Sequence, residues 1–443
     1  MPYQFLTRQP YKHQMETIQH MLCNKRAYDF SDLGSGKTSS SIWFSDILLE
    51  AGKIKKVLIV CPLSIINAVW AEEIKAVVPN RSYSIVHGTR AARIKALQKD
   101  AHFYITNHDA PRTYEAELLA MKFDVVIMDE VDAFKNAQSK RSKAMQRICA
   151  KAKAVYGLTG TPMANSPTDA FGIAKVVNPD RLPTPYITRW RQLTMTQYGE
   201  HIWEPNKDAE RIVHNVLQPA IRHRLEDCVD IPDMTFEYRE FELEAKQKKI
   251  YKEMYNHQLV ELKEGLIVAS TAAVKFTKLL QISAGVVYDN DGNPIVLNTK
   301  EKVNDILRVQ KEAGQVIVFV QFVEVIKHLV KIIPNARELY GDVPQKTRAN
   351  TIKDFRAGDF NILIAQPRIA AHGLNLQFCN HIIFFTPILG NSYYRQAIGR
   401  VRRSGQTKPQ VIINYYSSKA EKHLYKTLET KDVSSQMLLD MYN

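Results

Sequence analysis

The feature that most constrains the fold is a set of short apolar runs, each bounded by a turn or a polar residue. They are VLIVC (57–61), VVIM (125–128), VIVFV (316–320), ILIA (362–365) and IIFF (382–385). Such uninterrupted runs are typical of parallel strands covered on both faces, because a half-exposed strand alternates apolar with polar residues. Helix-like stretches, such as 39–52 and 67–78, lie between the runs. This alternation predicts an α/β fold with mostly parallel sheets.

The runs fall into two groups, at roughly 25–180 and 310–420, which predicts two α/β lobes. A chain of 443 residues has room for two or three domains, and 45% hydrophobic residues suffice for sizeable cores. We therefore expect an N-terminal lobe over 1–180, helical insertions and a link over 181–280, and a C-terminal lobe over 281–443.

The segment between the two groups is richer in charged and helix-forming residues. Spaced aromatic and leucine residues over 241–265 predict an amphipathic helix that lies over a lobe. The sequence DNDGNP at 289–294 predicts a turn.

The strongest local motif is SDLGSGKTSS, which follows the apolar stretch AYDF and opens a predicted helix. Its expected nucleotide contacts are Gly34, Ser35, Gly36, Lys37 and Thr38. The glycines let backbone N–H groups turn toward phosphate oxygens, the lysine adds positive charge, and the threonine offers a hydroxyl to Mg²⁺. Ser31 stands where the usual phosphate-loop pattern has its first glycine. A glycine-rich turn with an exposed lysine is the alternative interpretation of this motif alone.

About 90 residues later, FDVVIMDEVDAF places Asp129 and Glu130 just past an apolar strand. Ligands bind at the carboxyl ends of strands in open α/β sheets. One carboxylate there can hold Mg²⁺, and its neighbour can activate the attacking water. The alternative interpretation is that the two acids simply end a strand at a solvated edge. The phosphate loop and the acid pair in one lobe nevertheless predict together that the chain binds ATP or GTP.

Charge and cysteine content limit the partners and the compartment. Sixty Lys and Arg against 46 Asp and Glu give a net charge of +14, which favours a polyanion, with nucleic acid as the leading expectation. Five scattered cysteines without a C-x-x-C pair suggest a reduced cytosol and no zinc site. No signal peptide and no apolar run of roughly 18 residues is found, so we expect a soluble intracellular protein without a membrane partner.

Five motifs follow one another in a characteristic order. They are GSGKT, DEVD, YGLTGTPMANS (156–166), AAHGLNLQFCNHIIFF (370–385) and YRQAIGRVRRSGQ (394–406). In this order they resemble superfamily-two helicase motors and, within them, the SWI/SNF-type DNA translocases. LTGTP followed by Asn165, the GLNLQ run and the ending RRSGQ favour that branch. The resemblance covers about 10–420 and implies two RecA-like lobes with helical insertions.

The last motif carries its own chemistry. Gln396, Arg400 and Arg403 fall at spacings of four and three, so they share one helix face if the segment is helical. Such arginines can neutralise charge on the γ-phosphate, which makes turnover depend on lobe closure. A solvated basic face is the alternative for an isolated RxxR. The resemblance also assigns Gln14 to adenine recognition, which favours ATP over GTP.

Two positions depart from the family pattern. Asp132 stands where many relatives carry His, and His372 interrupts the glycine-rich run before GLNL. These departures bear on the coupling between nucleotide and polynucleotide.

The resemblance places the nucleic-acid contacts in loops that follow strands. The matching positions are Ser64, Thr106, Asn107, Gln321 and Asn375. These small polar side chains can bond phosphates without reading bases, so binding independent of sequence is expected. Turn and cap roles are the alternative for each residue taken alone.

These observations predict an ATP-dependent double-stranded DNA translocase that uses ATP and Mg²⁺ and does not need to separate the strands. Lys37, Asp129, Glu130, Arg400 and Arg403 are expected to be catalytic, with Thr38 and Asp129 as the Mg²⁺ ligands. The alternatives are a strand-separating DNA or RNA helicase and an ATP-liganded, nucleic-acid-binding assembly protein without turnover. Single-stranded DNA, RNA and a recruiting protein stay open as partners. The compact chain suits a cytoplasmic bacterial or phage enzyme, or a nuclear one in a eukaryote.

Overall fold

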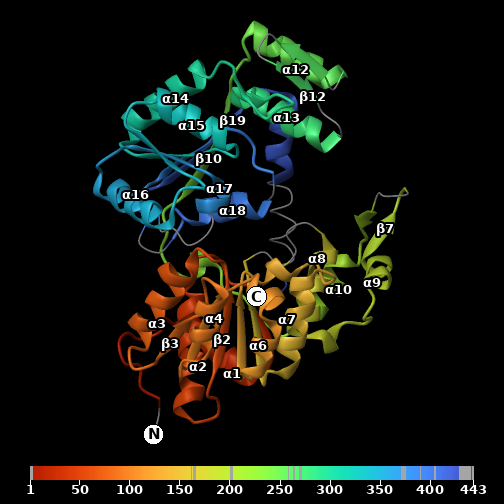
Figure 1. Cartoon of the computed structure of the whole chain (residues 1–443), viewed down its shortest axis with the longest axis vertical. Helices are drawn as coiled ribbons and strands as arrows, with labels where there is room; N and C mark the ends of the chain where they lie inside the picture. Colours follow the sequence, from red (N-terminus) through yellow and green to blue (C-terminus); the bar gives the residue numbers. More distant parts are fainter. Residues whose placement is uncertain are drawn as a thin grey trace. The chain divides into compact units, whose positions relative to one another are not determined.

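The chain forms two compact units, each built on one parallel sheet. The computed structural model describes residues 3–160, 162, 166–199, 203–257, 259–262, 265–268, 272–370, 376–389, 391–403, 406–428 and 441. The first unit is Met1–Asp230 with Lys431–Asn443, and the second is Ile231–Thr430. Figure 1 shows helices packed around each sheet. The predicted α/β fold with two parallel-sheet lobes is confirmed, whereas the three-part division at 180 and 280 stays a prediction.

The sheet of the first unit has seven parallel strands in the order β3-β4-β2-β5-β6-β1-β9. Their bounds are β1 (Arg26–Asp29), β2 (Val57–Cys61), β3 (Tyr83–Ile85), β4 (Phe103–Asn107), β5 (Val125–Asp129), β6 (Ala154–Leu158) and β9 (Ala220–Ile221). All five residues of β2 are buried, because alternate side chains enter separate apolar clusters on the two faces of the sheet. The apolar runs predicted as strands in this part of the chain are therefore confirmed.

Eleven α-helices of the described residues precede, connect or follow these strands. They are α1 (Lys12–Cys23), α2 (Lys37–Glu50), α3 (Glu72–Val77), α4 (Arg90–Leu97), α5 (Ala110–Thr113), α6 (Glu115–Ala120), α7 (Lys140–Lys151), α8 (Pro167–Val177), α9 (Ile187–Thr194), α10 (Ala209–Val216) and α11 (Leu225–Cys228). The helix predicted over 67–78 is divided, because a π-helical turn η1 (Ile66–Ala71) precedes α3. Between α9 and α10 the chain forms a hairpin of β7 (Met195–Gln197) and β8 (Trp203–Pro205).

The helix α8 lies directly against the turn that follows β5. That turn is the 3₁₀ helix η2 (Val131–Phe134). A Cβ atom at Gly172 of α8 would lie 1.8 Å from the carbonyl oxygen of Lys135, so only glycine permits this approach. The sequence after the acid pair is thereby fixed against the body of the first unit.

The second unit has six parallel strands in the order β10-β19-β18-β15-β17-β16. Their bounds are β10 (Met234–Glu240), β15 (Val316–Phe319), β16 (Ala336–Leu339), β17 (Ile362–Ala365), β18 (His381–Phe384) and β19 (Gln410–Tyr416). The helices are α12 (Ala245–His257), α13 (Ala272–Ala284), α14 (Lys300–Ala313), α15 (Val323–Ile332), α16 (Gln345–Ala357), α17 (Pro367–Ala370) and α18 (Asn391–Gly399). The three runs predicted as strands here are β15, β17 and β18, which confirms them.

The long helix predicted over 241–265 is wrong in its extent. Helix α12 covers only Ala245–His257, and β11 (Leu259–Leu262) then pairs antiparallel with β12 (Gly265–Val268). The runs LVEL and GLIV pair as short strands, which overrides the weak helical period beyond α12. The turn predicted at 289–294 is confirmed, since it joins β13 (Val286–Tyr288) to β14 (Pro294–Val296).

All five cysteines lie in the described part of the chain, and each is a free thiol. Among the described residues, the helices are all too short or too polar to cross a membrane.

Candidate functional site

The phosphate loop and the acid pair leave the same edge of the first sheet. Asp29, at the end of β1, and Asp129, at the end of β5, both lie opposite Leu158 of the intervening strand β6. Adjacent strands are about 4.8 Å apart, so the two strand ends are separated by about 10 Å. This edge is the carboxyl end of a parallel sheet, where ligands of open α/β folds bind.

The phosphate loop has the backbone that its glycines were expected to supply. Gly34 and Gly36 take φ angles of +91° and +86°, in the left-handed region that favours glycine. Helix α2 begins at the next residue, Lys37, and runs for 14 residues. Its first N–H groups and its dipole therefore meet an anion that binds in the loop.

The start of the loop is held by the segment that follows β9. The backbone N–H of His223 donates to Oγ of Ser31 over 3.1 Å, and that of Leu225 donates to Oδ2 of Asp32 over 3.0 Å. Ser31 does not adopt a positive φ, so this position does not require the glycine of the usual pattern. Its hydroxyl instead anchors the loop, which gives a physical reason for the departure.

The lysine of the loop is bonded within the loop itself. Nζ of Lys37 donates to the carbonyl oxygen of Ser31 and, over 3.0 Å, to that of Asp32. Neutral carbonyls bind an ammonium less strongly than a phosphate does. The lysine can therefore exchange these carbonyls for phosphate oxygens when a nucleotide binds.

Helix α1 brings two side chains to the phosphate loop. Gln14 is buried, and its amide nitrogen is so close to Gly36 that a Cβ atom there would lie 2.1 Å from it. The Oε1 atom of Gln14 accepts a bond from the N–H of Tyr11 over 2.9 Å. His13 donates from Nε2 to the carbonyl oxygen of Ser35 over 2.8 Å. The structure thus places Gln14 at the loop, while its contact with adenine stays a prediction.

The acid pair is held in a strained turn. Asp129 is the last residue of β5, and its Oδ1 accepts a bond from the N–H of Glu130 over 3.1 Å. Its Oδ2 accepts a bond from the indole of Trp70 over 2.9 Å. Glu130 has φ +51° and ψ +59°, a left-handed conformation that costs a non-glycine residue about 1–2 kcal/mol. Such strain is concentrated at functional sites.

Two neighbours of the acid pair were not predicted to act there. Trp70 lies within the stretch 67–78 that was expected to be helical, and its indole reaches Asp129. His108 donates from Nε2 to the carbonyl oxygen of Asp129 over 2.7 Å. The pKa of Asp132 is raised to about 6 by the loss of hydration, with a further rise from Asp169 and an opposing effect from Lys135. This carboxyl stands at the position that departs from the family pattern.

The predicted nucleic-acid contacts of the first unit divide into two groups. Oγ of Ser64 and Oδ1 of Asn107 are buried atoms without a hydrogen-bond partner among the described residues, as expected of groups that await a ligand. Thr106, in contrast, is fully buried within β4, and its hydroxyl donates to the carbonyl oxygen of Val86 over 2.9 Å. That placement argues against a phosphate contact by Thr106.

Most of the remaining predicted residues belong to the second unit. Gln396 is buried on α18, which ends at Gly399, so the conditional prediction of one helix face does not extend to Arg400 and Arg403. Nε of Arg403 donates to the carbonyl oxygen of Gly399 over 3.1 Å. Oε1 of Gln321 accepts a bond from the N–H of Leu389 over 3.0 Å. The predictions at Asn165, His372 and Asn375 lie outside the described residues.

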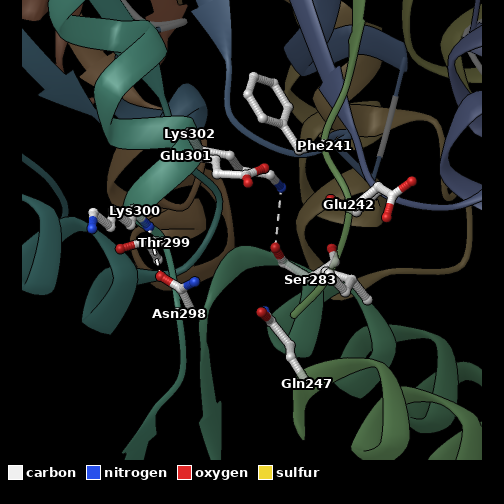
Figure 2. Close-up of a pocket in the computed structure, with 11 residues that line it drawn as sticks. Phe241, Glu242, Gln247, Ser283, Asn298, Thr299, Lys300, Glu301 and Lys302 are labelled. Atoms are coloured by element: carbon white, nitrogen blue, oxygen red, sulfur yellow. Dashed lines mark hydrogen bonds between the residues drawn. The ribbon is translucent and has the colours of Figure 1, made fainter. Parts of the chain in front are cut away.

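A small pocket opens at the start of α14 in the second unit. Figure 2 shows Lys302 reaching across it to the carbonyl oxygen of Ser283, and the bond measures 3.0 Å. Burial lowers the pKa of Lys302 to about 8, against an opposing effect from Glu421. The cavity volume of about 20 Å³ can hold a water molecule but not a nucleotide. The pocket is therefore not a second nucleotide site.

The donor set suits Mg²⁺ held mainly by a nucleotide. In the part of the chain that the structure describes, no group of three or more His, Cys, Asp or Glu side chains could hold a metal ion. Thr38 and Asp129 offer one hydroxyl and one carboxylate. Mg²⁺ in phosphate-binding enzymes takes one or two protein ligands and completes its shell with phosphates and waters. The residues present fit that mode of binding.

A comparison with protein families matches residues 14–285 to the SNF2-related domain. The chain belongs to the SNF2-related family. Residues 298–405 of this SNF2-family protein match the helicase conserved C-terminal domain. It is therefore a helicase-like, ATP-hydrolysing enzyme of superfamily two, which confirms the predicted enzyme class and family.

The most similar proteins include phage and bacterial relatives. "Putative protein p41" of Acyrthosiphon pisum secondary endosymbiont phage 1 is 27% identical, covering 92% of each chain. The "Putative ATP-dependent helicase/translocase YwqA" of Bacillus subtilis is 22% identical, covering 85% of this chain. The "Zorya protein ZorD" of Escherichia coli is 23% identical, covering 90% of this chain. This chain spans 42% and 41% of the length of the last two.

Among solved structures, the chain is similar to the Sulfolobus solfataricus SWI2/SNF2 ATPase core in complex with dsDNA. The identity is 21% and the TM-score is 0.49, with 100% of this chain and 96% of the other covered.

Proposed function

We propose that this SNF2-family ATPase is a double-stranded DNA translocase, which uses ATP and Mg²⁺ to move along duplex DNA without obligatory strand separation. The observation that carries the proposal is the phosphate loop and the acid pair at strand ends about 10 Å apart, in a chain of the SNF2-related family. The net charge of +14 supports a polyanionic track. A bacterial relative named as a putative helicase/translocase supports motor activity.

Each residue of the proposed site has a defined task. The ammonium of Lys37 leaves its loop carbonyls and binds the nucleotide phosphates. Thr38 and Asp129 hold Mg²⁺, and Glu130 orients and deprotonates the attacking water. Phosphates that bind Gly34, Ser35 and Gly36 lie at the start of α2, where its dipole stabilises negative charge.

Four further residues complete the proposed nucleotide site. Gln396, Arg400 and Arg403 bind the nucleotide, and the two guanidinium groups neutralise charge that develops on the γ-phosphate. An arginine in this role is typically worth about 10³- to 10⁵-fold in rate. Gln14 recognises adenine.

Ser64 and Asn107 support binding of a nucleic acid through its phosphate backbone. Their unpartnered oxygen atoms suit contacts with phosphates, directly or through water, and neither side chain is long enough to read base edges deep in a groove. We propose the same task for Gln321 and Asn375. Binding through phosphates predicts that affinity falls steeply with salt and depends little on sequence.

Steady-state ATP hydrolysis tests the proposal. Rates are compared without nucleic acid and with single-stranded DNA, duplex DNA or duplex RNA, using Glu130→Gln as the inactive enzyme and Glu204→Gln, an exposed residue of β8, as the matched control. We expect duplex DNA to stimulate ATP hydrolysis strongly. In a second assay, we expect the enzyme to displace a third strand bound to the duplex as a triplex, which would show that it moves along the DNA. Stimulation by single strands or RNA together with duplex unwinding would instead support a helicase. A flat rate in all four conditions would overturn the proposal.

A further inference from the structure

Two loops of the first unit each send one side chain to Asp129. The loop after β2 contains Ser64 and leads into the π-helical turn with Trp70, and the loop after β4 begins at His108, next to Asn107 at the strand end. These loops start side by side, because Cys61 at the end of β2 pairs with Asn107 at the end of β4.

We propose that Trp70 and His108 are positioning residues through which nucleic acid bound at these two loops orients Asp129 for hydrolysis. The inference rests on the proposed function, and it adds a structural link by which bound nucleic acid controls the acid pair. Neither residue needs to touch the nucleotide in this role.

The first connection is made by Trp70. Its side chain is fully buried, and its indole N–H donates to Oδ2 of Asp129 over 2.9 Å. The indole has one polar hydrogen, so this bond fixes a single direction. Trp70 lies in η1, whose π-helical bonds rotate the following side chains relative to an α-helix. π-Helical turns are often found at functional sites, and here the turn separates the loop of Ser64 from the regular helix α3.

The second connection is made by His108. Because a carbonyl oxygen can only accept, Nε2 of His108 carries the proton in its bond to the backbone oxygen of Asp129, at 2.7 Å. The imidazole of His108 also contacts the ring of Phe134 in η2. The two rings meet edge-on, with their centroids 5.5 Å apart. His108 thus links the loop of Asn107 to both sides of the strained turn at Glu130.

Together the two bonds hold Asp129 at its carboxylate and at its backbone, from the two loops with unpartnered oxygen atoms. A bond of 2.7–2.9 Å weakens when its partners move by a few tenths of an ångström. A small shift of either loop on binding phosphate therefore alters the orientation of the carboxylate toward Mg²⁺. Misplacement of a catalytic group by about 1 Å can cost about 100-fold in rate.

Trp70→Phe tests the first connection, because it removes the indole N–H and keeps an aromatic ring. Trp190→Phe is the matched control, since Trp190 is equally buried in the same unit and its indole N–H donates to the carbonyl oxygen of Pro167 over 3.0 Å. We expect Trp70→Phe alone to lower the DNA-stimulated kcat by about 10- to 100-fold, the worth of a bond to a charged group. The KM for ATP should change less than about threefold, and the Mg²⁺ concentration for half-maximal rate should rise.

His108 is tested by rescue. His108→Ala should reduce the ratio of DNA-stimulated to unstimulated rate, and His108→Gln, which restores an N–H donor, should recover it in part. A merely structural role would lower thermal stability in Trp70→Phe and Trp190→Phe alike and leave both the ratio and the Mg²⁺ dependence unchanged.

The outcomes separate the two proposals. Stimulation of the unmodified enzyme by DNA, with the same stimulation in Trp70→Phe and His108→Ala as in Trp190→Phe, would overturn the inference and leave the proposed function in place. An unmodified enzyme that no nucleic acid stimulates would overturn both.

Discussion

Gly36 offers the sharpest test of how the phosphate loop is built. Its φ of +86° is left-handed, and a Cβ atom there would lie 2.1 Å from the amide nitrogen of Gln14. Gly36→Ala therefore adds about 1–2 kcal/mol of backbone strain and displaces Gln14 at a rotamer cost of about 0.5–1.5 kcal/mol. The loop relieves both costs by leaving this conformation, and nucleotide binding must then restore it. We expect the affinity for nucleotide to fall by about 10- to 400-fold, corresponding to about 1.5–3.5 kcal/mol.

Isothermal titration with ADP and with a non-hydrolysable ATP analogue measures this loss. Gly52→Ala is the matched control, because Gly52 is also left-handed, at φ +64°, and has no atom within 4 Å of its Cβ position. Gly52→Ala should lose about 1–2 kcal/mol of folding stability and keep its nucleotide affinity, whereas Gly36→Ala should lose affinity, because its loop relaxes in the free protein. Equal nucleotide affinity in Gly36→Ala and Gly52→Ala would refute the reasoning.

Three further predictions concern the stability of the fold. Gly172→Ala should lower the free energy of unfolding by about 1–3 kcal/mol in urea titrations, because its Cβ would overlap the Lys135 carbonyl; a gain of about 0.5–1 kcal/mol, as for an ordinary helical glycine, would contradict the packing of α8. The folded-state pKa of Asp132, about 6, lies above its ordinary value of 3.8, so the folded state binds more protons and stability should fall by up to about 3 kcal/mol as pH rises from 4 through 6. Asp132→Asn should remove that fall, and an unchanged pH profile would count against a raised pKa of this carboxyl. The folded-state pKa of Lys302, about 8, lies below its ordinary 10.5, so the unfolded state binds more protons and stability should rise by up to about 3 kcal/mol between pH 8 and 10.5. Lys302→Met should flatten that rise, and parallel profiles for the two proteins would show that Lys302 keeps its ordinary pKa.

The strands could be predicted from the sequence because their signal is local. A buried parallel strand is apolar at every position, so VLIVC at 57–61 is recognisable without knowledge of its neighbours. The helix over 241–265 was predicted too long, because the apolar spacing that gives α12 its buried face continues into residues that pair as β11 and β12. Short apolar segments fit either period, and pairing with a partner strand settles the outcome.

The candidate site was predictable where it is contiguous in the chain. The loop at 34–38 and the acids at 129 and 130 each carry their chemistry in adjacent residues. Trp70 and His108 were missed because only the strand order β4-β2-β5 brings them to Asp129, and sequence spacing does not encode that order.

Thr106 shows the limit of assigning loops by residue type. It is the penultimate residue of β4, and its hydroxyl bonds the Val86 carbonyl, whereas Oδ1 of Asn107, at the strand end, has no partner among the described residues. Successive side chains of a strand point to opposite faces, so a boundary error of one residue exchanges a bonded hydroxyl for an unpartnered amide oxygen.

The left-handed conformation of Glu130 has a consequence for how this enzyme can change by mutation. Glycine is relaxed at φ +51°, so Glu130→Gly would relieve about 1 kcal/mol or more of strain and also remove the proposed general base. Variants enriched for thermal resistance alone would then accumulate glycine at this position and lose hydrolysis. Retention of glutamate under such selection would show that ATP hydrolysis is still required, so the residue at position 130 would distinguish lineages that use the ATPase from those that do not.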